Sequence, residues 1–596
     1  MKPLRQSIPT LLALLLLASA SGCANLGGDN QQSFAITLMH VNDTHSRIED
    51  LPGETLTING VATRVDMAGM PRLAAKVKAV RAENANTLLL HAGDAVQGTL
   101  YFSRYHGTAE FDFLNEMGVD AMVIGNHEFD KGAAYLADFI GYADFPMISA
   151  NIDASGSPEL AGRIAPFTII TVGNEKIGII GLTTASTAVL SSPGDGIVFK
   201  EEAATAERYV TELESTGINK IIALTHLGYD EDVILARMVP GIDIIVGGHT
   251  HTLLGGDALR DIGLLPAGSY PTLVENPEGD PVYIVQSWEK GKVLGILNVT
   301  FDGDGKITAT SGNPVLLVDD NFEQIETGGD MNAVDAPTRA AIMEVIDANN
   351  SIEVVREDAS AQAIRDTYKP GIDRMQNEVI ARAGENLYHT RIPGADSLGA
   401  GVSFPSGSHI APHVAGSMLW KVNHGGNRNA DLAIKAGGGV RTGIPRGKIT
   451  VGNAYELMPF ENTLVVVELT GAEVKAAIQG GVTTAVSGLS DGAFPYVADV
   501  RYIVDAATDP KHPKVTRVEI RNADGAWTAI ADTAAYRIVV DSYLADGGDF
   551  YSVIGNAAGY RYDTGFTDVE AFMEYAREKG VLNRLDENGV TWQTGN

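Results

Sequence analysis

An apolar run that stops abruptly at Gly125-Asn126-His127-Glu128 constrains this chain more than any other stretch. The run covers residues 121–124 and gives way at once to side chains that can bind metal or move protons. Such a run is typical of a parallel strand covered on both faces, and in open α/β sheets chemistry collects just beyond the carboxyl ends of such strands. The stretch therefore predicts a buried strand that exits into an active-site loop.

Four further apolar runs end in side chains of the same kind. In chain order, these exits are Asn42-Asp43-Thr44-His45, His91-Ala92-Gly93-Asp94, Thr225-His226-Leu227-Gly228 and Gly247-Gly248-His249-Thr250-His251. One such exit alone is more often a turn with a surface histidine. Together they are what a two-metal site at the carboxyl edge of a sheet requires, and their carboxylate, imidazole and amide groups suit Zn, Mn or Fe. The absence of thiolates argues against a purely structural zinc site.

The chain alternates apolar runs with helical periodicity from Phe34 to about Asp320, which predicts a layered α/β domain at residues 34–320. Residues 321–384 are polar and favour helices at 338–348 and 360–380, which predicts a helical linker with a break at Tyr368-Lys369-Pro370-Gly371. Residues 385–596 would form a second lobe. In the first domain the expected strands are 36–41, 87–91, 121–124, 146–150, 176–182, 220–225 and 242–246, and the expected helices are 71–84, 110–117, 201–215 and 231–238.

The charge balance excludes one class of partner. Lys and Arg number 44 against 75 Asp and Glu, which gives a formal net charge of −31. Such a chain repels polyanions, so nucleic-acid polymers are not expected as ligands. A solvated acidic surface suited to a salty habitat is a sufficient explanation of the charge. The sequence predicts no oligomeric state.

The first residues are a targeting segment. Lys2 and Arg5 precede an apolar core at 11–17, and small residues then lead to Cys23. This pattern resembles a bacterial lipoprotein signal at residues 1–23, lipidated at Cys23 and followed by a flexible tether at 24–33; the alternative is an ordinary secretory signal with an incidental cysteine. We expect an exported protein, either an outer-membrane lipoprotein or a periplasmic protein of a Gram-negative bacterium. The chain has one cysteine, so no disulfide is expected.

The five exits together resemble the metal-binding pattern of calcineurin-like metallophosphoesterases. The continuation Glu128-Phe129-Asp130 and the long second half resemble, more specifically, the secreted 5′-nucleotidase and UDP-sugar hydrolase family over nearly all of the mature chain. The resemblance implies a four-layer α/β catalytic domain, a β-sandwich flanked by helices, that the linker joins to an α/β substrate-binding domain. It also implies two divalent metal ions, with Zn favoured and Mn, Co or Mg as alternatives. Asp43, His45, Asp94 and His251 would hold one metal, and Asp94, Asn126, His226 and His249 the other, with Asp94 as the bridge.

The reaction that this pattern implies is hydrolysis at phosphorus. Two adjacent cations lower the pKa of a shared water and neutralise phosphoryl oxygens, so hydroxide can attack in line without a covalent enzyme intermediate. By resemblance, His127 would stabilise the transition state or protonate the leaving oxygen, and Asp130 would hold its ring. Glu128 is expected to have a structural role instead, such as bonding a nearby backbone amide.

The second lobe carries no further metal-like cluster in its sequence, so we expect it to recognise the substrate. Phe460 and Tyr543 resemble the family's two aromatic residues that clamp the base; ordinary core packing is the alternative. Stacking at about 1–3 kcal/mol per base accepts any base, which predicts broad base tolerance. Ala436 departs from the family, which usually has Asn there, and Ala cannot bond to the base or ribose. The other implied contacts are Arg391 for phosphate, Gly438, Gly439 and Arg441 in a Gly-rich loop, and Asp549 for the ribose hydroxyls, whereas the segment 491–496 is expected to be structural.

The substrate is less determined than the reaction. Segments 55–60, 64–66 and 98–102 resemble the branch of the family that contains NAD nucleotidases, which would cleave NAD to NMN and AMP and then dephosphorylate mononucleotides. A 5′-nucleotidase or UDP-sugar hydrolase without NAD preference is the close alternative, and a 2′,3′-cyclic phosphodiesterase shares the metal pattern. A nucleotide-binding lipoprotein without turnover would be expected to lose His127 or Asp94, and both are present.

Overall fold

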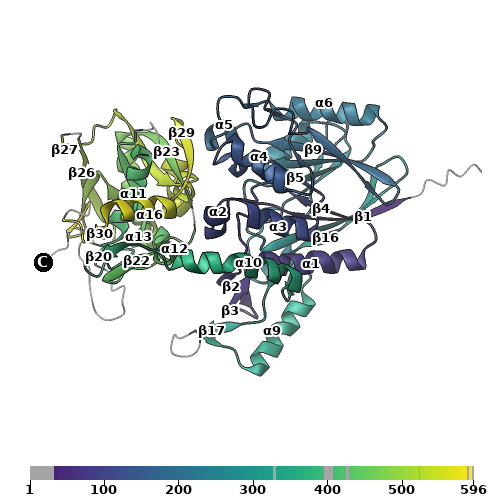
Figure 1. The fold of residues 1–596 in the computed structure, drawn as a ribbon. Helices are drawn as coiled ribbons and strands as arrows, with labels where there is room; N and C mark the ends of the chain where they lie inside the picture. Colours follow the sequence, from purple (N-terminus) through teal and green to yellow (C-terminus); the bar gives the residue numbers. More distant parts are fainter. Residues whose placement is uncertain are drawn as a thin grey trace, which may run out of the picture.

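The computed structural model describes residues 33–325, 331–394, 407–424, 429–460, 462–509, 511–522, 524–586 and 589–593. Within these residues the chain forms two lobes that lie side by side (Figure 1). The N-terminal lobe contains the elements from β1 (Phe34–Val41) to β19 (Ile352–Val354), and the C-terminal lobe those from β20 (Val379–Ala383) to β31 (Val590–Gln593). The predicted signal peptide with its lipidation site Cys23 lies outside the described residues.

Two β-sheets face each other in the N-terminal lobe, and aliphatic side chains such as Leu38, Val123 and Leu224 fill a buried cluster between them. The first sheet has the order β18 (Met331–Ala333), β17 (Glu323–Ile325), β3 (Val61–Met67), β16 (Ile307–Val318), β15 (Val293–Phe301), β1, β4 (Thr87–His91), β5 (Ala121–Val123) and β6 (Met147–Ile148), with β2 (Leu51–Ile58) paired to β3 and β19 paired to β16. The second has the order β13 (Thr272–Glu275), β14 (Pro281–Val285), β12 (Ile244–Val246), β11 (Ile221–His226), β9 (Glu175–Thr183) and β8 (Phe167–Val172).

Helices cover the outer face of each sheet. On the first sheet, α1 (Met70–Glu83), α3 (Thr108–Met117) and α4 (Ala133–Tyr142) share one core, and on the second, α6 (Glu202–Ser215) and α7 (Tyr229–Met238) share another. The lobe is therefore a β-sandwich between two helical layers, which confirms the predicted α/β class and the four-layer arrangement. The predicted strands and helices of this lobe lie within about two residues of the observed ones.

The parallel strands bring their carboxyl ends together. β1 is parallel to β4 and β4 to β5, with Leu38 opposite Leu88, whereas β11 is parallel to β9 and β12, with Leu224 opposite Val246. The five polar exits thus come from two facing sheets and not from the edge of one sheet, which corrects the sequence-based expectation. Strand periodicity shows which runs are buried on both faces, but it does not show which of them share a sheet.

The stretch that the sequence predicts as a helical linker, residues 321–384, contains strands as well as helices. Its strands β17, β18 and β19 belong to the first sheet, and α9 (Ala336–Ala348) packs beside β19. The long helix α10 (Ala359–Gln376) lies against α1, α3 and α2 (Leu100–Tyr105) and reaches α12 (Val451–Leu457) of the C-terminal lobe (Figure 1).

The predicted break at Tyr368-Lys369-Pro370-Gly371 is wrong, because α10 continues through Pro370. A proline inside a helix costs about 3 kcal/mol, so packing must outweigh that local penalty. The Tyr105 hydroxyl donates to the carbonyl oxygen of Tyr368 at 2.6 Å, and the two rings lie 4.7 Å apart. Gly371 gives the Tyr105 ring room to approach the helix.

The C-terminal lobe is built on a central sheet with the order β24 (Pro495–Ala498), β21 (Leu432–Ala436), β28 (Ala535–Asp541), β23 (Thr463–Thr470) and β29 (Arg561–Thr567). β21 and β28 are parallel, so the Gly-rich turn after β21 and the short helix α14 (Ser542–Ala545) after β28 meet at one edge. Around this sheet lie α11 (Ala411–His424), α13 (Gly471–Ser487), α16 (Asp568–Lys579) and two small sheets, β22 (Gly447–Thr450), β20 and β30 (Val581–Leu582), and β27 (Trp527–Ala529), β26 (Lys514–Arg521), β25 (Val500–Asp505) and β31.

A search of the described residues for a helix that could span a membrane found none of sufficient length and apolar character.

Candidate active site between the lobes

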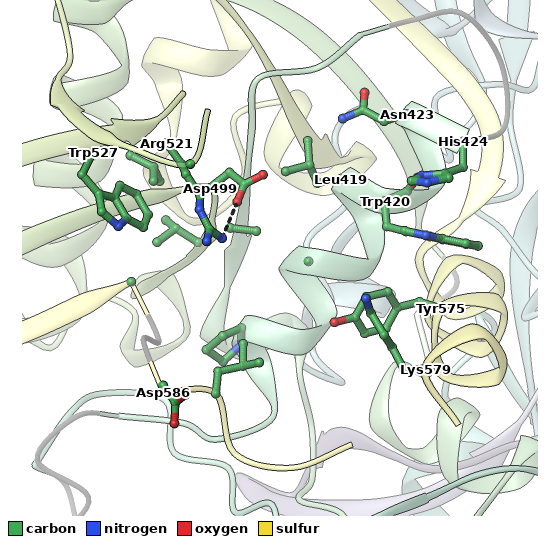
Figure 2. A pocket seen from close by; sticks show the side chains of 18 residues that line it. Leu419, Trp420, Asn423, His424, Asp499, Arg521, Trp527, Tyr575, Lys579 and Asp586 are labelled. Carbon is green, nitrogen blue, oxygen red and sulfur yellow. Dashed lines mark hydrogen bonds and ion pairs between the residues drawn. The ribbon is translucent and has the colours of Figure 1, made fainter. Parts of the chain in front are cut away.

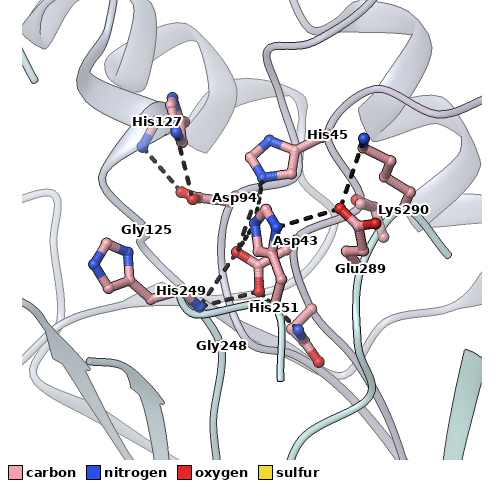
Figure 3. A network of polar contacts seen from close by, with 12 residues as sticks. Asp43, His45, Asp94, Gly125, His127, Gly248, His249, His251, Glu289 and Lys290 are labelled. Carbon is pink, nitrogen blue, oxygen red and sulfur yellow. Dashed lines mark hydrogen bonds and ion pairs between the residues drawn. The ribbon is translucent and has the colours of Figure 1, made fainter. Parts of the chain in front are cut away.

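Side chains from four of the five predicted exits lie together in Figure 3, and His226 from the remaining exit has its Nε2 3.0 Å from Asp94 Oδ2. Three groups of them could each hold a metal ion, because the ligand atoms of each group lie within 4.8 Å of one another. The groups are Asp43, His45 and His251; His45, Asp94 and His127; and Asp94, His226 and His249.

In the first group, acceptor atoms converge on His251. Its Nε2 lies 3.1 Å from His45 Nε2 and 3.4 Å from Asp43 Oδ1, and its Nδ1 lies 3.3 Å from Glu289 Oε2. A proton on Nδ1 would bond to Glu289 and leave the Nε2 lone pair directed at the group. Burial opposes a charged ring, but Asp43 and Glu289 outweigh burial and raise the pKa of His251 to about 10. The group therefore favours positive charge, either a second proton or a metal ion.

The group of Asp94, His226 and His249 repeats this design around His226. Its Nδ1 lies 2.7 Å from the carbonyl oxygen of Ala92, so Nδ1 carries the proton and Nε2 is left as an acceptor. That Nε2 lies 3.0 Å from both Asp94 Oδ2 and Asn126 Oδ1, and the His249 ring lies 5.0 Å away. Burial opposes a charged ring, yet Asp94 outweighs it and raises the pKa of His226 to about 9. A cation would satisfy the three converging acceptors.

The two carboxylates at the centre of these groups are buried without a Lys or Arg partner. The side chains of Asp43 and Asp94 are 0% and 2% exposed, and among the described residues their ion pairs are all with histidines. Uncompensated buried carboxylates are costly, so they are paired or bind metals in stable proteins. Asp94 shares one group with His45 and another with His226, as a bridging ligand would. The donors therefore fit two divalent cations of borderline character.

The backbone of the groups is bent in a way that the sequence did not predict. Five of the candidate ligands have a positive φ, a conformation that costs non-glycine residues about 1–2 kcal/mol and that collects at functional sites. Gly125 has a different reason to be glycine, since a Cβ there would lie 2.2 Å from Asp94 Oδ1. The five ligands are Asp43, His45, Asp94, His249 and His251, with φ of 49°, 45°, 56°, 77° and 51°.

Glu128 does not face the metal groups. Its carboxylate accepts from the backbone amides of Asp94 at 3.0 Å, Ala95 at 2.8 Å and Gly125 at 2.7 Å. It therefore ties the loop after β4 to the loop after β5, which confirms the predicted structural role.

His127 lies at the edge of the metal groups with its ring held from behind. Its Nδ1 lies 2.6 Å from Asp130 Oδ2, and Asp130 Oδ1 accepts from the Ser191 hydroxyl at 2.8 Å. Its Nε2 lies 3.9 Å from Asp94 Oδ2 and lines the cavity. Burial disfavours the charged ring, but Asp130 and Asp94 prevail and raise the pKa of His127 well above its usual range. The ring can therefore hold a proton at Nε2, beside the place where a phosphate would bind.

Both lobes line the cavity above the metal groups, which has a volume of about 680 Å³. The N-terminal lobe contributes five of the seven candidate ligands and His127, and the C-terminal lobe contributes Phe460, Tyr543 and Asp563. A second pocket of about 400 Å³ shares Phe460, Asn462, Tyr543 and Lys290 with this cavity and continues into the C-terminal lobe. The two spaces therefore adjoin at these four residues, between the metal groups and the C-terminal lobe.

Every predicted substrate-binding residue lies on the wall of this second pocket. Phe460 and Tyr543 are 44% and 51% exposed, which argues against ordinary core packing. The Arg441 guanidinium lies 5.4 Å from the centre of the Phe460 ring, and Ser490 Oγ donates to Asp549 Oδ1 at 2.7 Å. The predicted residues on the pocket wall are Arg391, Gly438, Gly439, Arg441, Phe460, Tyr543 and Asp549, together with Ala436.

The segment 491–496 divides into two parts. Phe494 and Tyr496 are fully buried, in agreement with the structural role expected for it. Asp491, however, lies on the pocket wall, where its Oδ1 pairs with Arg391 Nη1 at 2.5 Å. A phosphate that binds Arg391 would have to compete with this carboxylate.

The residues of the cavity that sequence reasoning missed include Glu289, Lys290, Asn462 and Asp563. The first two follow β14, a further parallel strand beside β12, so the apolar run 282–285 before a polar loop was an available signal. Asp563 comes from β29 at the other end of the chain, and no local pattern connects it to His127. Burial is the largest effect on Asp563 and raises its pKa to about 6.

A separate cavity of about 840 Å³ opens on the C-terminal lobe between α11, α16 and the small sheet of β25 to β27 (Figure 2). Trp420, Tyr575 and Trp527 line it, and Arg521 Nη1 lies 3.8 Å from Asp499 Oδ1 on its wall. None of the predicted site residues lines this cavity, so it is not part of the candidate active site.

Comparison with known proteins agrees with the geometry. Residues 36–253 match the calcineurin-like phosphoesterase family, and residues 406–556 match the 5′-nucleotidase C-terminal domain. The probable 5′-nucleotidase of Treponema pallidum is 36% identical over 96% of this chain and 96% of its own length. The NAD 5′-nucleotidase of Haemophilus influenzae is 32% identical over 95% of this chain and 94% of its own length.

Two solved structures extend the likeness to the whole fold. The NAD nucleotidase of Haemophilus influenzae superposes with a TM-score of 0.78 at 31% identity, over 95% of this chain and 100% of that one. A 5′-nucleotidase precursor from Thermus thermophilus has a TM-score of 0.59 at 38% identity, over 94% of this chain and 100% of that one.

Proposed function

Since the chain belongs to the 5′-nucleotidase family of metal-dependent nucleotide hydrolases, we propose that it removes the 5′-phosphate of nucleoside monophosphates and cleaves NAD to NMN and AMP. The observation that carries this proposal is that two spaces adjoin, the cavity over the metal groups and the pocket with Phe460 and Tyr543. A nucleotide carries a phosphate at one end and a base at the other, so its two ends match these two spaces.

Two divalent cations would occupy the metal groups, with Zn favoured. When bound, they would supply a hydroxide nucleophile near neutral pH and neutralise the phosphoryl oxygens. The convergent acceptor atoms around His226 and His251 support this assignment, because each ring has its other nitrogen bonded to a carbonyl or carboxylate oxygen. The proposed ligands are Asp43, His45, Asp94 and His251 for one ion, and Asp94, Asn126, His226 and His249 for the other.

His127 would donate a proton from Nε2 to the leaving oxygen or bond to the phosphoryl group. The contact of 2.6 Å between its Nδ1 and Asp130 supports this role, because it fixes the ring with Nε2 toward the cavity. Ser191 in turn holds Asp130 from the opposite side.

The C-terminal lobe would bind the nucleoside part. Phe460 and Tyr543 would stack on the base, and Asp549, held by Ser490, would accept from the ribose hydroxyls. Arg391 would contact a phosphate group, and Arg441 would contact the substrate from the same wall. Because Ala436 has no polar side chain, base discrimination would rest on stacking, and we expect purine and pyrimidine nucleotides to be hydrolysed alike.

Cleavage of NAD requires that the same centre accept a pyrophosphate as well as a terminal phosphate. The match to the NAD nucleotidase of Haemophilus influenzae over nearly the whole chain supports this part of the proposal. A UDP-sugar would present the same pyrophosphate with a hexose on its second phosphate, so it is the main competing substrate.

Release of phosphate and nucleoside from NAD, AMP and UDP-glucose in parallel tests the function. We expect the protein to release AMP and phosphate from NAD, and phosphate from AMP. Both activities should be lost in EDTA and should return when Zn²⁺ or Mn²⁺ is added back. Absence of metal-dependent hydrolysis of all three would overturn the proposal. Hydrolysis of AMP and UDP-glucose with NAD left intact would favour the UDP-sugar hydrolase alternative, and elemental analysis of the purified protein would identify the metal.

We also propose that the protein is exported and anchored by a lipid at Cys23, with a catalytic domain at 34–320, a linker at 321–384 and a substrate-binding domain at 385–596. The basic and apolar residues before Cys23 support export. Mass spectrometry of the mature N-terminus would distinguish a lipidated Cys23 from cleavage at an ordinary secretory site.

A further inference from the structure

A buried ion triad lies directly behind the nucleoside pocket. Lys435 in β21 is 0% exposed, and its Nζ lies 2.7 Å from Asp541 Oδ2 and 2.6 Å from Asp568 Oδ2. Both carboxylates are 1% exposed. Charged groups are rarely buried so completely, and replacing buried ion pairs by apolar residues is often neutral or stabilising for a fold. The triad is therefore better explained by what it holds in place than by stability.

Each member of the triad supports a different wall of the pocket. Lys435 underlies the Gly-rich turn, because a Cβ at Gly439 would lie 2.8 Å from Lys435 Cε. Asp541 caps α14 by accepting from the Leu544 amide at 2.9 Å, and this helix carries Tyr543. Gly439 and Tyr543 both line the nucleoside pocket.

Asp568 is linked through the backbone to the segment that carries the other ring of the clamp, Phe460. Its backbone amide donates to the carbonyl oxygen of Asn462 at 2.9 Å, and Asn462 lies two residues after Phe460 on the same wall. The same aspartate begins α16, directly after the strand that brings Asp563 into the metal cavity. One ammonium group thus joins the segment of Tyr543 to the segment of Phe460.

We propose that Lys435 is a positioning residue for nucleotide binding, in which the bridge from Asp541 through Lys435 to Asp568 sets the separation of the Tyr543 and Phe460 rings and supports the Gly-rich turn between them. The inference rests on the proposed function, since it concerns the clamp for the base. It concerns substrate recognition, because the side-chain bonds of Lys435 go to Asp541 and Asp568 and to none of the candidate metal ligands.

The variant Lys435→Met tests this role with two substrates. AMP needs the clamp, whereas p-nitrophenyl phosphate offers a phosphate ester without a nucleoside. We expect the KM for AMP and the Kd for adenosine to rise at least tenfold, with turnover of p-nitrophenyl phosphate and metal content unchanged. A parallel loss of both activities, or an unchanged KM for AMP in the folded variant, would overturn the proposal.

A double-mutant cycle with Tyr543→Ala sharpens the test, because residues that act through one another have non-additive effects. Lys435→Met should weaken adenosine binding much less when Tyr543 is already absent, and full additivity would count against the bridge. Lys421→Met is the matched control: it removes a largely buried lysine that pairs with Glu574 at 2.6 Å in the same lobe, outside the pocket. It should leave adenosine binding unchanged.

Asp568→Asn covers the case in which Lys435→Met does not fold. It preserves the shape of the side chain and weakens one arm of the bridge, so we expect the Kd for adenosine to rise about threefold; an unchanged Kd would overturn the proposal. Failure of the wild-type protein to hydrolyse any nucleotide would refute the proposed function. Normal hydrolysis of AMP by the wild-type protein with no effect of these variants would refute only the role of Lys435.

Discussion

The ring of His127 is held so firmly that its replacement should affect the reaction and little else. The contact with Asp130 and the bond from Ser191 to Asp130 fix one ring nitrogen, and the other faces the cavity. We expect His127→Ala to lower turnover of AMP by about 10² or more, as for other lost acid–base groups, with metal content near normal. Steady-state kinetics and elemental analysis of the same preparation would measure both. Unchanged turnover would rule out the role given to His127.

Glu289 offers a test of the metal assignment that does not change a ligand. Its carboxylate faces His251 Nδ1 at 3.3 Å and Lys292 Nζ at 2.7 Å. Partners of this kind orient a ligand ring, and their loss commonly weakens metal binding 10–100-fold. We therefore expect Glu289→Gln to weaken the binding of one of two metal ions by about that factor in a competition titration with a chelator.

Lys292→Gln is the control for Glu289→Gln, because it breaks the ion pair and keeps the contact with His251. It should leave both metal affinities unchanged. Equal weakening by the two variants would mean that the ion pair, and not the orientation of His251, maintains the site.

At the scale of elements, the stability of α10 depends on the close contact between Gly371 and the Tyr105 side chain. Gly to Ala inside a helix normally stabilises it by about 1 kcal/mol. At Gly371 the new Cβ would lie 1.9 Å from Tyr105 Oη, so overpacking of about 1–3 kcal/mol and a weakened bond to Tyr368 should outweigh that gain. We expect Gly371→Ala to lower the apparent Tm by about 1–3 °C in a thermal melt.

Gly480 in α13 provides the matched comparison for Gly371. It also lies inside a helix, but a Cβ there would meet nothing within 4 Å. Gly480→Ala should keep or raise the apparent Tm. A lower Tm for both variants would show that the effect at Gly371 does not come from Tyr105.

For some elements, the local sequence is enough to predict a buried strand and the polar loop that follows it. The runs before Asp94 and Asn126 predicted buried strands and their exits because burial on both faces leaves an unbroken apolar run. The same signal preceded Glu289 and was missed only because no Asp or His follows β14 at once. The prediction of a helix break at Pro370 was wrong because the local penalty of a proline is visible in the sequence, whereas the packing of Tyr105 against the helix is not.

The remaining features of the site depend on contacts between distant residues. Asp563 meets the cavity around His127 across the two lobes, and the bridge of Lys435 joins segments that lie over a hundred residues apart. Neither has a local pattern. The positive φ of Asp43 is also set by its surroundings, since its own residue type favours no such conformation strongly enough to predict it.

At the scale of the molecule, the cavity exists only where the lobes meet. Near it, Gln97 Nε2 donates to the carbonyl oxygen of Gly565 at 3.3 Å, and the Tyr562 hydroxyl donates to the carbonyl oxygen of Ser191 at 3.4 Å. These are long polar contacts, and polar interfaces between domains usually permit relative motion. Such motion would let the metal centre meet either the terminal phosphate of AMP or the inner pyrophosphate of NAD.

The net charge of the whole chain should govern how anionic substrates approach this cavity. A formal charge of −31 repels nucleotides at long range, whereas Arg391, Arg441 and Lys290 attract them close to the site. The Debye length is about 30 Å at 0.01 M salt and about 8 Å at 0.15 M, so added salt screens the distant repulsion more than the local attraction. We expect kcat/KM for AMP to rise about two- to tenfold as KCl increases from 10 to 150 mM at saturating metal. Inhibition by neutral adenosine should not change over this range, and a falling kcat/KM would show that the cations of the pocket control the approach at every distance.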